Sequence, residues 1–300
     1  MDSRELTAAI SNYIISQVPQ VIYTPEDLEK ARAAYTPDEM QLLRNAGWLE
    51  NGFECFYVIN RFLTQSGFAD SADDRCLREI FRSAKRLDAA AFRADPYLSA
   101  IRVPEAKIGR FTLTHASYDR GELLQYGMPD LRKSTVVPKL GFFTEKVSFP
   151  AVYEGDMPWV SVCPSEISSM GPDVEKAWGK CLVLGLGLGW YPFMISNLNT
   201  VESVTVVEIS EEIISLFEKH ILPQFPHREK IRVLHADAFD VLNALSPGEY
   251  DFCYADIWES QVDGAKCCKR IFPHEKRLSG TEFRYWIEDE IRWWMEQEED

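Results

Sequence analysis

Glycines and carboxylates follow four short apolar runs in the second half of the chain. After the run CLVL, glycine occupies every second position, at Gly185, Gly187 and Gly189. Each of three later runs is followed by one acid: Glu208, Asp237 and Asp256. A glycine-rich turn lets a ligand approach the backbone closely, and carboxylates accept strong hydrogen bonds from hydroxyl or amino groups. The pattern predicts a nucleotide-like ligand, with a purely structural turn as the alternative.

These residues fall at the ends of predicted strands between residues 180 and 258. The strands are CLVLG, VESVTVVEI, KIRVLHADA and EYDFCYADI, and the helices between them are WYPFMISNL, SEEIISLFEKHIL and AFDVLNAL. Strands that alternate with helices through short connections form βαβ units and a parallel sheet. Ligands of such sheets bind at the carboxyl ends of the strands, beside the topological switch point. We therefore expect the glycines and the three acids to meet in one site.

The spacing of the glycines distinguishes this loop from a dinucleotide-binding motif. A dinucleotide fingerprint has its third glycine where this chain has Trp190. Over about residues 165–260, the chain instead resembles the class I S-adenosylmethionine-dependent methyltransferases, in particular their spermidine-synthase-like branch. The resemblance is carried by the G-x-G-x-G loop and by the acids at three successive strand ends. It implies an α/β fold with a Rossmann-like methyltransferase core and a mostly parallel sheet.

The resemblance also implies a cofactor, S-adenosylmethionine or its decarboxylated form. In the family, the glycine loop approaches the methionine part of the cofactor. The acid matching Glu208 binds the ribose hydroxyls, and the acid matching Asp237 binds the adenine amino group. We expect Glu208 to face an open cleft. The cofactor-binding residues implied in this way are Gly185, Leu186, Gly187, Gly189, Glu208, Ile209, Asp237, Ala238 and Asp256.

Asp256 and Glu259 are the candidate catalytic residues. The segment Asp256-Ile-Trp-Glu259 resembles the D-x-x-D-P segment of aminopropyltransferases, in which two acids hold the attacking amine and help to deprotonate it. Ser260 replaces the proline, and Leu188 stands where spermidine synthases carry an aspartate between their glycines. Methyl transfer to a small, cationic acceptor therefore ranks above aminopropyl transfer. A non-catalytic or regulatory protein that binds the cofactor is the third hypothesis.

Charge is distributed unevenly along the 300 residues. Residues 1–150 carry 19 basic and 20 acidic residues and residues 151–300 carry 13 and 27, so net charges of −1 and −14 make up the total of −15. An acidic half opposes phosphate-backbone binding and attracts cations, so a small-molecule acceptor is the expected partner and nucleic acid is not. A membrane partner is not expected, because no apolar run approaches the roughly 20 residues of a membrane helix.

Cysteine usage and the amino terminus bear on the compartment. The seven cysteines contain no C-x-x-C pair and no zinc-ligand spacing, which predicts reduced thiols and no metal. The amino-terminal residues carry acids where a signal peptide would carry a basic and then an apolar block. We therefore expect a cytoplasmic protein, with a homodimer as the assembly considered.

The chain is predicted to divide into a helical region, residues 1–108, and a second domain, residues 109–300. Thr24-Pro and Thr36-Pro each predict the start of a helix, and the helical region is interpreted as a lid or substrate domain. Residues 109–163 cluster β-branched and aromatic residues between prolines and glycines, which predicts strands and hairpins.

The sheet is predicted to be short after its fourth strand. A helix is expected over residues 166–178, before the first strand. After Asp256, the segment CCKRIFPHEKRLSG is polar and broken, and residues 281–296 have large apolar residues at helical spacing. The sheet would then be truncated, with its free edge covered by the hairpins or by the carboxyl-terminal helix.

Overall fold

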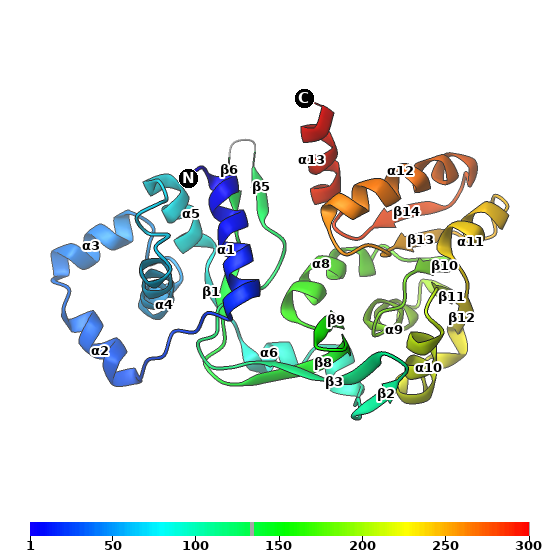
Figure 1. Cartoon of the computed structure of the whole chain (residues 1–300), viewed down its shortest axis with the longest axis horizontal. Helices are drawn as coiled ribbons and strands as arrows, with labels where there is room; N and C mark the ends of the chain where they lie inside the picture. The colour runs from blue at the N-terminus through cyan, green and yellow to red at the C-terminus, as the bar shows by residue number, and fades with distance from the viewer. Residues whose placement is uncertain (133–134, 300) are drawn as a thin grey trace. The chain divides into compact units, whose positions relative to one another are not determined.

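The computed structural model describes residues 1–132 and 135–299, which form two compact units (Figure 1). Unit 1 comprises Met1–Arg93 and Ser117–Ser148, and unit 2 comprises Ala94–Ala116 and Phe149–Asp300. The single boundary predicted between residues 108 and 109 does not separate these units. The chain leaves unit 1 after Arg93, returns to it at Ser117 and leaves it again after Ser148. Among the described residues, no helix is both long and apolar enough to cross a membrane.

Unit 1 consists of helices packed on short strands. Thr24 and Thr36 cap two of these helices as the sequence predicts, since each hydroxyl accepts a hydrogen bond from the third helical N–H. Phe56, Phe62 and Phe81 form part of its core and are at most 4% exposed. The elements are α1 (Ser3–Gln17), α2 (Pro25–Ala33), α3 (Pro37–Asn45), α4 (Gly52–Gln65), α5 (Asp74–Ser83), β1 (Lys85–Arg86), α6 (Ala89–Arg93), β4 (Leu124–Gln125), β5 (Asp130–Arg132), β6 (Thr135–Val137) and β7 (Leu140–Phe142).

Unit 2 is centred on a five-stranded parallel sheet with the order β12-β11-β10-β13-β14. The strands are β10 (Gly179–Leu184), β11 (Val201–Glu208), β12 (Ile231–His235), β13 (Phe252–Ala255) and β14 (Glu282–Tyr285). All four strands predicted from the sequence are present. The chain adds strands first on one side of β10 and then on the other, so the order reverses at β10, as in doubly wound α/β sheets.

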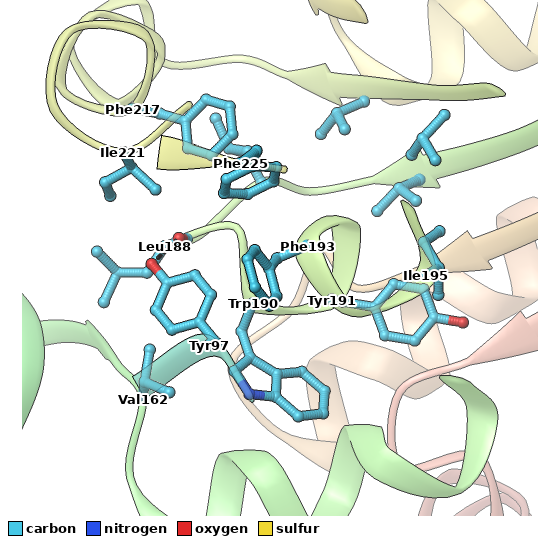
Figure 2. Packing of buried hydrophobic residues seen from close by; sticks show 14 of the residues in the cluster. Tyr97, Val162, Leu188, Trp190, Tyr191, Phe193, Ile195, Phe217, Ile221 and Phe225 are labelled. Atoms are coloured by element: carbon cyan, nitrogen blue, oxygen red, sulfur yellow. Dashed lines mark hydrogen bonds between the residues drawn. The ribbon is translucent and has the colours of Figure 1, made fainter. Parts of the chain in front are cut away.

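Helices cover both faces of this sheet (Figure 1). On one face, Cys181, Val204 and Phe252 of the strands are buried with apolar side chains of α8, α9 and α10. Figure 2 shows this cluster around α9, where Phe193 packs edge-on against Phe225. α12 lies on the opposite face. The helices of unit 2 are α7 (Pro96–Ala100), α8 (Pro164–Val174), α9 (Trp190–Ser196), α10 (Glu211–His220), α11 (Ala238–Ala244), α12 (Gln261–Arg277) and α13 (Glu288–Glu299), with short 3-10 turns η1 (Leu222–Gln224) and η2 (Arg228–Lys230).

The expectations for the end of the chain are wrong in two respects. The polar and broken segment after Asp256 lies in α12, which continues through Pro273 and buries Cys268 and Ile271. The predicted helix over residues 281–296 begins instead with β14, the fifth strand of the sheet. Phe283 and Tyr285 alternate with polar residues, and a strand buries both against the neighbouring elements, leaving them 8% and 1% exposed. The sheet is therefore not truncated after its fourth strand.

The hairpin segment does not cover the edge of the parallel sheet. Its longer strands form a separate four-stranded sheet of order β2-β3-β8-β9, whose described pairs are antiparallel. These strands are β2 (Ala106–Ile108), β3 (Phe111–Tyr118), β8 (Val147–Glu154) and β9 (Met157–Ser161). The edge of β13 is paired by β14, so its backbone groups do not need the hairpins as partners.

Candidate functional site

A cavity of about 790 Å³ lies in unit 2 at the carboxyl ends of the parallel strands. Its lining comes from the segments after β10, β11, β12 and β13, from β9 and α8, and from Trp286 after β14. The volume is within the range of about 300–1,000 Å³ that is usual for small-molecule sites. Of the residues predicted to form the site, those in the lining are Gly185, Leu186, Gly187, Glu208, Ile209, Asp237, Ala238, Asp256 and Glu259. Gly189 is not in the lining.

The three glycines of the loop have different roles. A Cβ at Gly185 would stand 1.9 Å from the backbone oxygen of Asp256, and a Cβ at Gly189 would stand 2.4 Å from the ring of Phe217. All three glycines have positive φ angles, of +98° at Gly185, +53° at Gly187 and +76° at Gly189. A Cβ at Gly187 would meet only a methyl group of Val160, at 3.4 Å. Two glycines therefore permit close packing within the fold, and Gly187 leaves room in the cavity.

The loop is anchored from α7, which belongs to the same unit. The buried hydroxyl of Tyr97 donates to the backbone oxygen of Leu188 at 2.5 Å. Trp190, which stands where a dinucleotide motif has its third glycine, donates through Nε1 to the carboxylate of Asp95 at 3.3 Å. Figure 2 shows Tyr97, Leu188 and Trp190 at this junction. These contacts hold the glycine loop in place within the fold.

Glu208 is buried, contrary to the expectation that it faces an open cleft. Its side chain is 6% exposed at the end of β11. One carboxylate oxygen accepts the backbone N–H of Leu186 at 3.2 Å, and the other accepts that of Ser210 at 2.8 Å. Each oxygen can accept a second hydrogen bond. Glu208 therefore both ties the glycine loop to β11 and offers acceptor capacity at the cavity.

Asp237 and Ile209 lie on the same side of the cavity. Asp237 is the N-cap of α11, and one of its carboxylate oxygens accepts the backbone N–H of Phe239 at 2.7 Å. Within the part of the chain that the structure describes, its other oxygen has no hydrogen-bond partner. Ile209 is 67% exposed although it follows a buried strand. An exposed apolar side chain beside two carboxylates suits the face of a planar heterocycle whose edge carries N–H donors.

On the opposite side of the cavity, the charge of Glu166 acts on Asp256. The sequence did not predict Glu166 as a site residue. Both residues line the cavity, Glu166 from the first turns of α8 and Asp256 from the end of β13. Burial raises the pKa of Glu166 to about 7. Burial and then the charge of Glu166 raise the pKa of Asp256 well above its ordinary range. Glu259, the predicted partner of Asp256, is exposed at the cavity rim.

A sequence signal for Glu166 exists, although it is weak. Glu166 is the only charged residue between Asp156 and Asp173. A single acid within an otherwise uncharged stretch is a candidate for partial burial, because exposed helices usually carry several charges. Only the fold brings this acid to the carboxyl end of β13.

Two buried polar groups in the cavity lining have no partner. The Tyr254 hydroxyl and the Trp258 Nε1 lack hydrogen bonds within the described chain, and these side chains are 0% and 7% exposed. Tyr254 is held in place by stacking on Tyr191, with ring centroids 3.8 Å apart. Buried polar groups are nearly always hydrogen-bonded in native proteins.

The charge of the lining has one sign only. Its acids are Glu154, Glu166, Glu208, Asp237, Asp256 and Glu259, and no lysine, arginine or histidine is among the described residues of the lining. Glu154 forms an ion pair with Arg110 at 3.0 Å, so its charge is already compensated, and the raised pKa of Asp256 favours its neutral form. The remaining acids favour a cationic ligand and oppose a phosphate.

Comparisons with known proteins place the chain in no family. No family model matches the sequence, and no curated protein matches it. One similar solved structure is described as a conserved hypothetical protein from Streptococcus pyogenes. It is 14% identical with a TM-score of 0.28, and the match covers 34% of this chain and 60% of that chain. The fold and the cavity define an α/β protein with an acidic cavity at the carboxyl ends of a parallel sheet.

Proposed function

We propose that unit 2 binds S-adenosylmethionine or a related sulfonium nucleoside and transfers one of its alkyl groups to a small acceptor. The observation that carries the proposal is that the glycine loop, Glu208 and Asp237 line one cavity at the switch point of the sheet. In this arrangement Glu208 accepts hydrogen bonds from the ribose hydroxyls and Asp237 from the adenine amino group. Gly187 leaves space for the arm that carries the sulfonium.

The charge of the cavity supports a sulfonium nucleoside over a dinucleotide. A pyrophosphate would need N–H donors and cations, and the described lining provides carboxylates in place of cations. A sulfonium and an ammonium group on one ligand are both attracted by these acids. The same charge favours an acceptor that is itself a cation, since it must share the cavity with the donor.

Aminopropyl transfer is the second candidate, and a specific observation favours it. S-adenosylmethionine carries a carboxylate on its methionine arm, and the described lining has no cationic side chain to receive it. The decarboxylated nucleoside has an aminopropyl arm in place of that amino acid, and the acids of the cavity suit it. A protein that binds the nucleoside without turnover would share the loop, Glu208 and Asp237 but would not need Glu166 or Asp256.

Calorimetric titration of the full chain tests the proposal. The ligands are S-adenosylmethionine, S-adenosylhomocysteine, decarboxylated S-adenosylmethionine and NAD. We expect at least one sulfonium nucleoside to bind and NAD not to bind, and tighter binding of the decarboxylated form would favour aminopropyl transfer. Gly187→Ala should abolish nucleoside binding, because its methyl group would occupy the space beside Val160. Absence of binding by all three nucleosides would contradict the proposal.

A further inference from the structure

Two side chains at the start of α7 hold the end of the glycine loop, and neither of them lines the cavity. The hydroxyl of Tyr97 donates to the backbone oxygen of Leu188 at 2.5 Å (Figure 2). Both carboxylate oxygens of Asp95 accept from Nε1 of Trp190, each at 3.3 Å. Leu188 and Trp190 do line the cavity, on either side of Gly189 in the sequence. Asp95 and Tyr97 therefore act on the cavity only through the loop.

Both side chains that hold the loop have little freedom to move. Asp95 is the N-cap of α7, where its Oδ1 also accepts the backbone N–H groups of Tyr97 and Leu98 at 2.9 and 3.1 Å. The Tyr97 side chain is fully buried and packs edge-on against Phe193 of α9, with ring centroids 5.4 Å apart. Burial raises the pKa of Tyr97, so its hydroxyl remains a hydrogen-bond donor near neutral pH. One short helix thus holds both contact groups in fixed positions.

The end of the glycine loop is packed more closely than its middle. A Cβ at Gly189 would stand 2.4 Å from the ring of Phe217, so the loop passes close to α10 at this point. The N–H of Gly189 donates to the backbone oxygen of Leu186 at 2.9 Å, which closes the turn. A Cβ at Gly187, in the middle of the loop, would meet only a methyl group of Val160. The middle of the loop therefore depends on the contacts that hold its end.

We propose that Tyr97 and Asp95 are positioning residues of the nucleoside site, which hold the glycine loop in its binding conformation before the ligand arrives. The inference rests on the proposed function, because the nucleoside is the ligand of the loop. A loop that is already ordered loses little conformational entropy when the ligand binds, so the affinity is higher. When the binding conformation is only fractionally populated, the apparent dissociation constant rises in inverse proportion to that fraction. Neither side chain needs to contact the nucleoside, because both act through the loop.

Hydrogen–deuterium exchange of the ligand-free full chain tests the hold on the loop. Tyr97→Phe removes only the hydroxyl that donates to Leu188. Tyr285→Phe is the matched control, because Tyr285 is 1% exposed and its hydroxyl donates to Glu275 at 3.0 Å outside the cavity lining. We expect Tyr97→Phe to increase exchange in peptides that cover residues 184–190 by about 3- to 10-fold, and Tyr285→Phe to leave these peptides unchanged. Equal exchange of the loop in the two variants would overturn the proposal.

Calorimetric titration with S-adenosylhomocysteine tests whether the hold on the loop affects binding. Tyr97→Phe should weaken binding by about 3- to 10-fold, the fold-change that corresponds to one lost hydrogen bond, and bound ligand should reduce the extra exchange of the loop. Tyr285→Phe should change the affinity by less than about twofold. Asp95→Ala should also weaken binding, and Asp95→Asn should retain it, because asparagine caps a helix and offers Trp190 an acceptor. Unchanged affinity of Tyr97→Phe, despite faster exchange of its loop, would contradict a role in positioning.

The two measurements also separate this inference from the proposed function. If the nucleoside binds equally to the unmodified chain, Tyr97→Phe and Asp95→Ala, the nucleoside site stands and the positioning role is wrong. If no nucleoside binds to the unmodified chain but Tyr97→Phe increases exchange of the loop, the hold on the loop stands and the proposed function is wrong. Circular dichroism shows whether each variant is folded. If Tyr97→Phe does not fold, Asp95→Ala and Asp95→Asn decide the matter, and equal affinities of these two variants would overturn the proposal.

Discussion

The two sides of the cavity hold their carboxyl groups in different ways. On the side of β11 and β12, Glu208 and Asp237 accept hydrogen bonds from backbone N–H groups close to them in the sequence. On the side of α8 and β13, Glu166 and Asp256 are surrounded by apolar and acidic groups, and burial raises both pKa values. The first side offers fixed acceptors to hydroxyl and amino groups. The second side favours the protonated forms of its carboxyl groups.

The largest expected effect comes from substituting Gly185, which lies between the two sides of the cavity. The N–H of Gly185 donates to Val207 of β11, and its Cα packs on the backbone oxygen of Asp256. Gly185→Ala should therefore lower the free energy of unfolding by roughly 3–5 kcal/mol, from overpacking and from a side chain at positive φ. Urea denaturation measures the change. A midpoint within error of the unmodified chain would show that the two sides can move apart.

Glu166→Gln should change the pH dependence of stability. The folded pKa of about 7 lies above the ordinary value of 4.5, so the stabilising contribution of Glu166 is complete below pH 4.5 and is lost as the pH rises through about 7. This loss amounts to about 3 kcal/mol, and the glutamine variant should lack it. Urea denaturation between pH 4 and pH 8 measures both slopes. Glu175→Gln is the control, because Glu175 is exposed at the end of the same helix and is not in the cavity lining. Parallel slopes for the unmodified chain and Glu166→Gln would show that Glu166 is not buried in its acid form.

Glu208→Ala tests the opposite side. It should weaken nucleoside binding by roughly 1.5–3 kcal/mol, the range for hydrogen bonds to a charged group. It should also lower the free energy of unfolding by about 1–3 kcal/mol, because the N–H groups of Leu186 and Ser210 lose their acceptor. Glu202→Ala, at an exposed position of the same strand, is the control for calorimetry and denaturation. Loss of stability with unchanged affinity would limit Glu208 to holding the loop.

The smallest expected effect is that of Glu259→Gln. Glu259 is exposed at the rim, and charges in that position are screened by solvent. The free energy of unfolding should change by less than about 0.5 kcal/mol, and its pH dependence should match that of the unmodified chain, unlike that of Glu166→Gln. Urea denaturation between pH 4 and pH 8 compares the two variants. A larger effect for Glu259→Gln would restore the pairing of Asp256 with Glu259 that the sequence suggested.

The sequence predicts the framework of unit 2 because its signals are local. Apolar runs of strand length alternate with helical patterns between residues 180 and 258, and all four predicted strands occur in the sheet. The carboxyl ends of parallel strands lie at one edge, so residues at those ends meet whatever the details of packing. This geometry brings Gly187, Glu208, Asp237 and Asp256 to one cavity.

The fifth strand, β14, could not be predicted from a local pattern in the same way. Residues 281–296 carry aromatic residues that fit both a helical stripe and a short alternation. Pairing with β13 satisfies the backbone groups of Glu282–Tyr285, and the helix begins only after Ile287, which has a positive φ of 50°. That pairing partner lies about 30 residues earlier in the chain, beyond the reach of a local pattern.

The sequence alone therefore determined where the four predicted strands end and which of the residues at those ends are glycines or acids. The tertiary structure decided which of these features pack within the fold and which line the cavity. Gly185 packs on Asp256, some 70 residues later, and Gly187 does not pack on backbone. Glu166 meets Asp256 only because α8 and β13 converge on one cavity, and its pKa rises only because that cavity removes water from it. Burial and the separation of charges in space are properties of the folded chain, and they set the chemistry of the acids that the sequence supplies.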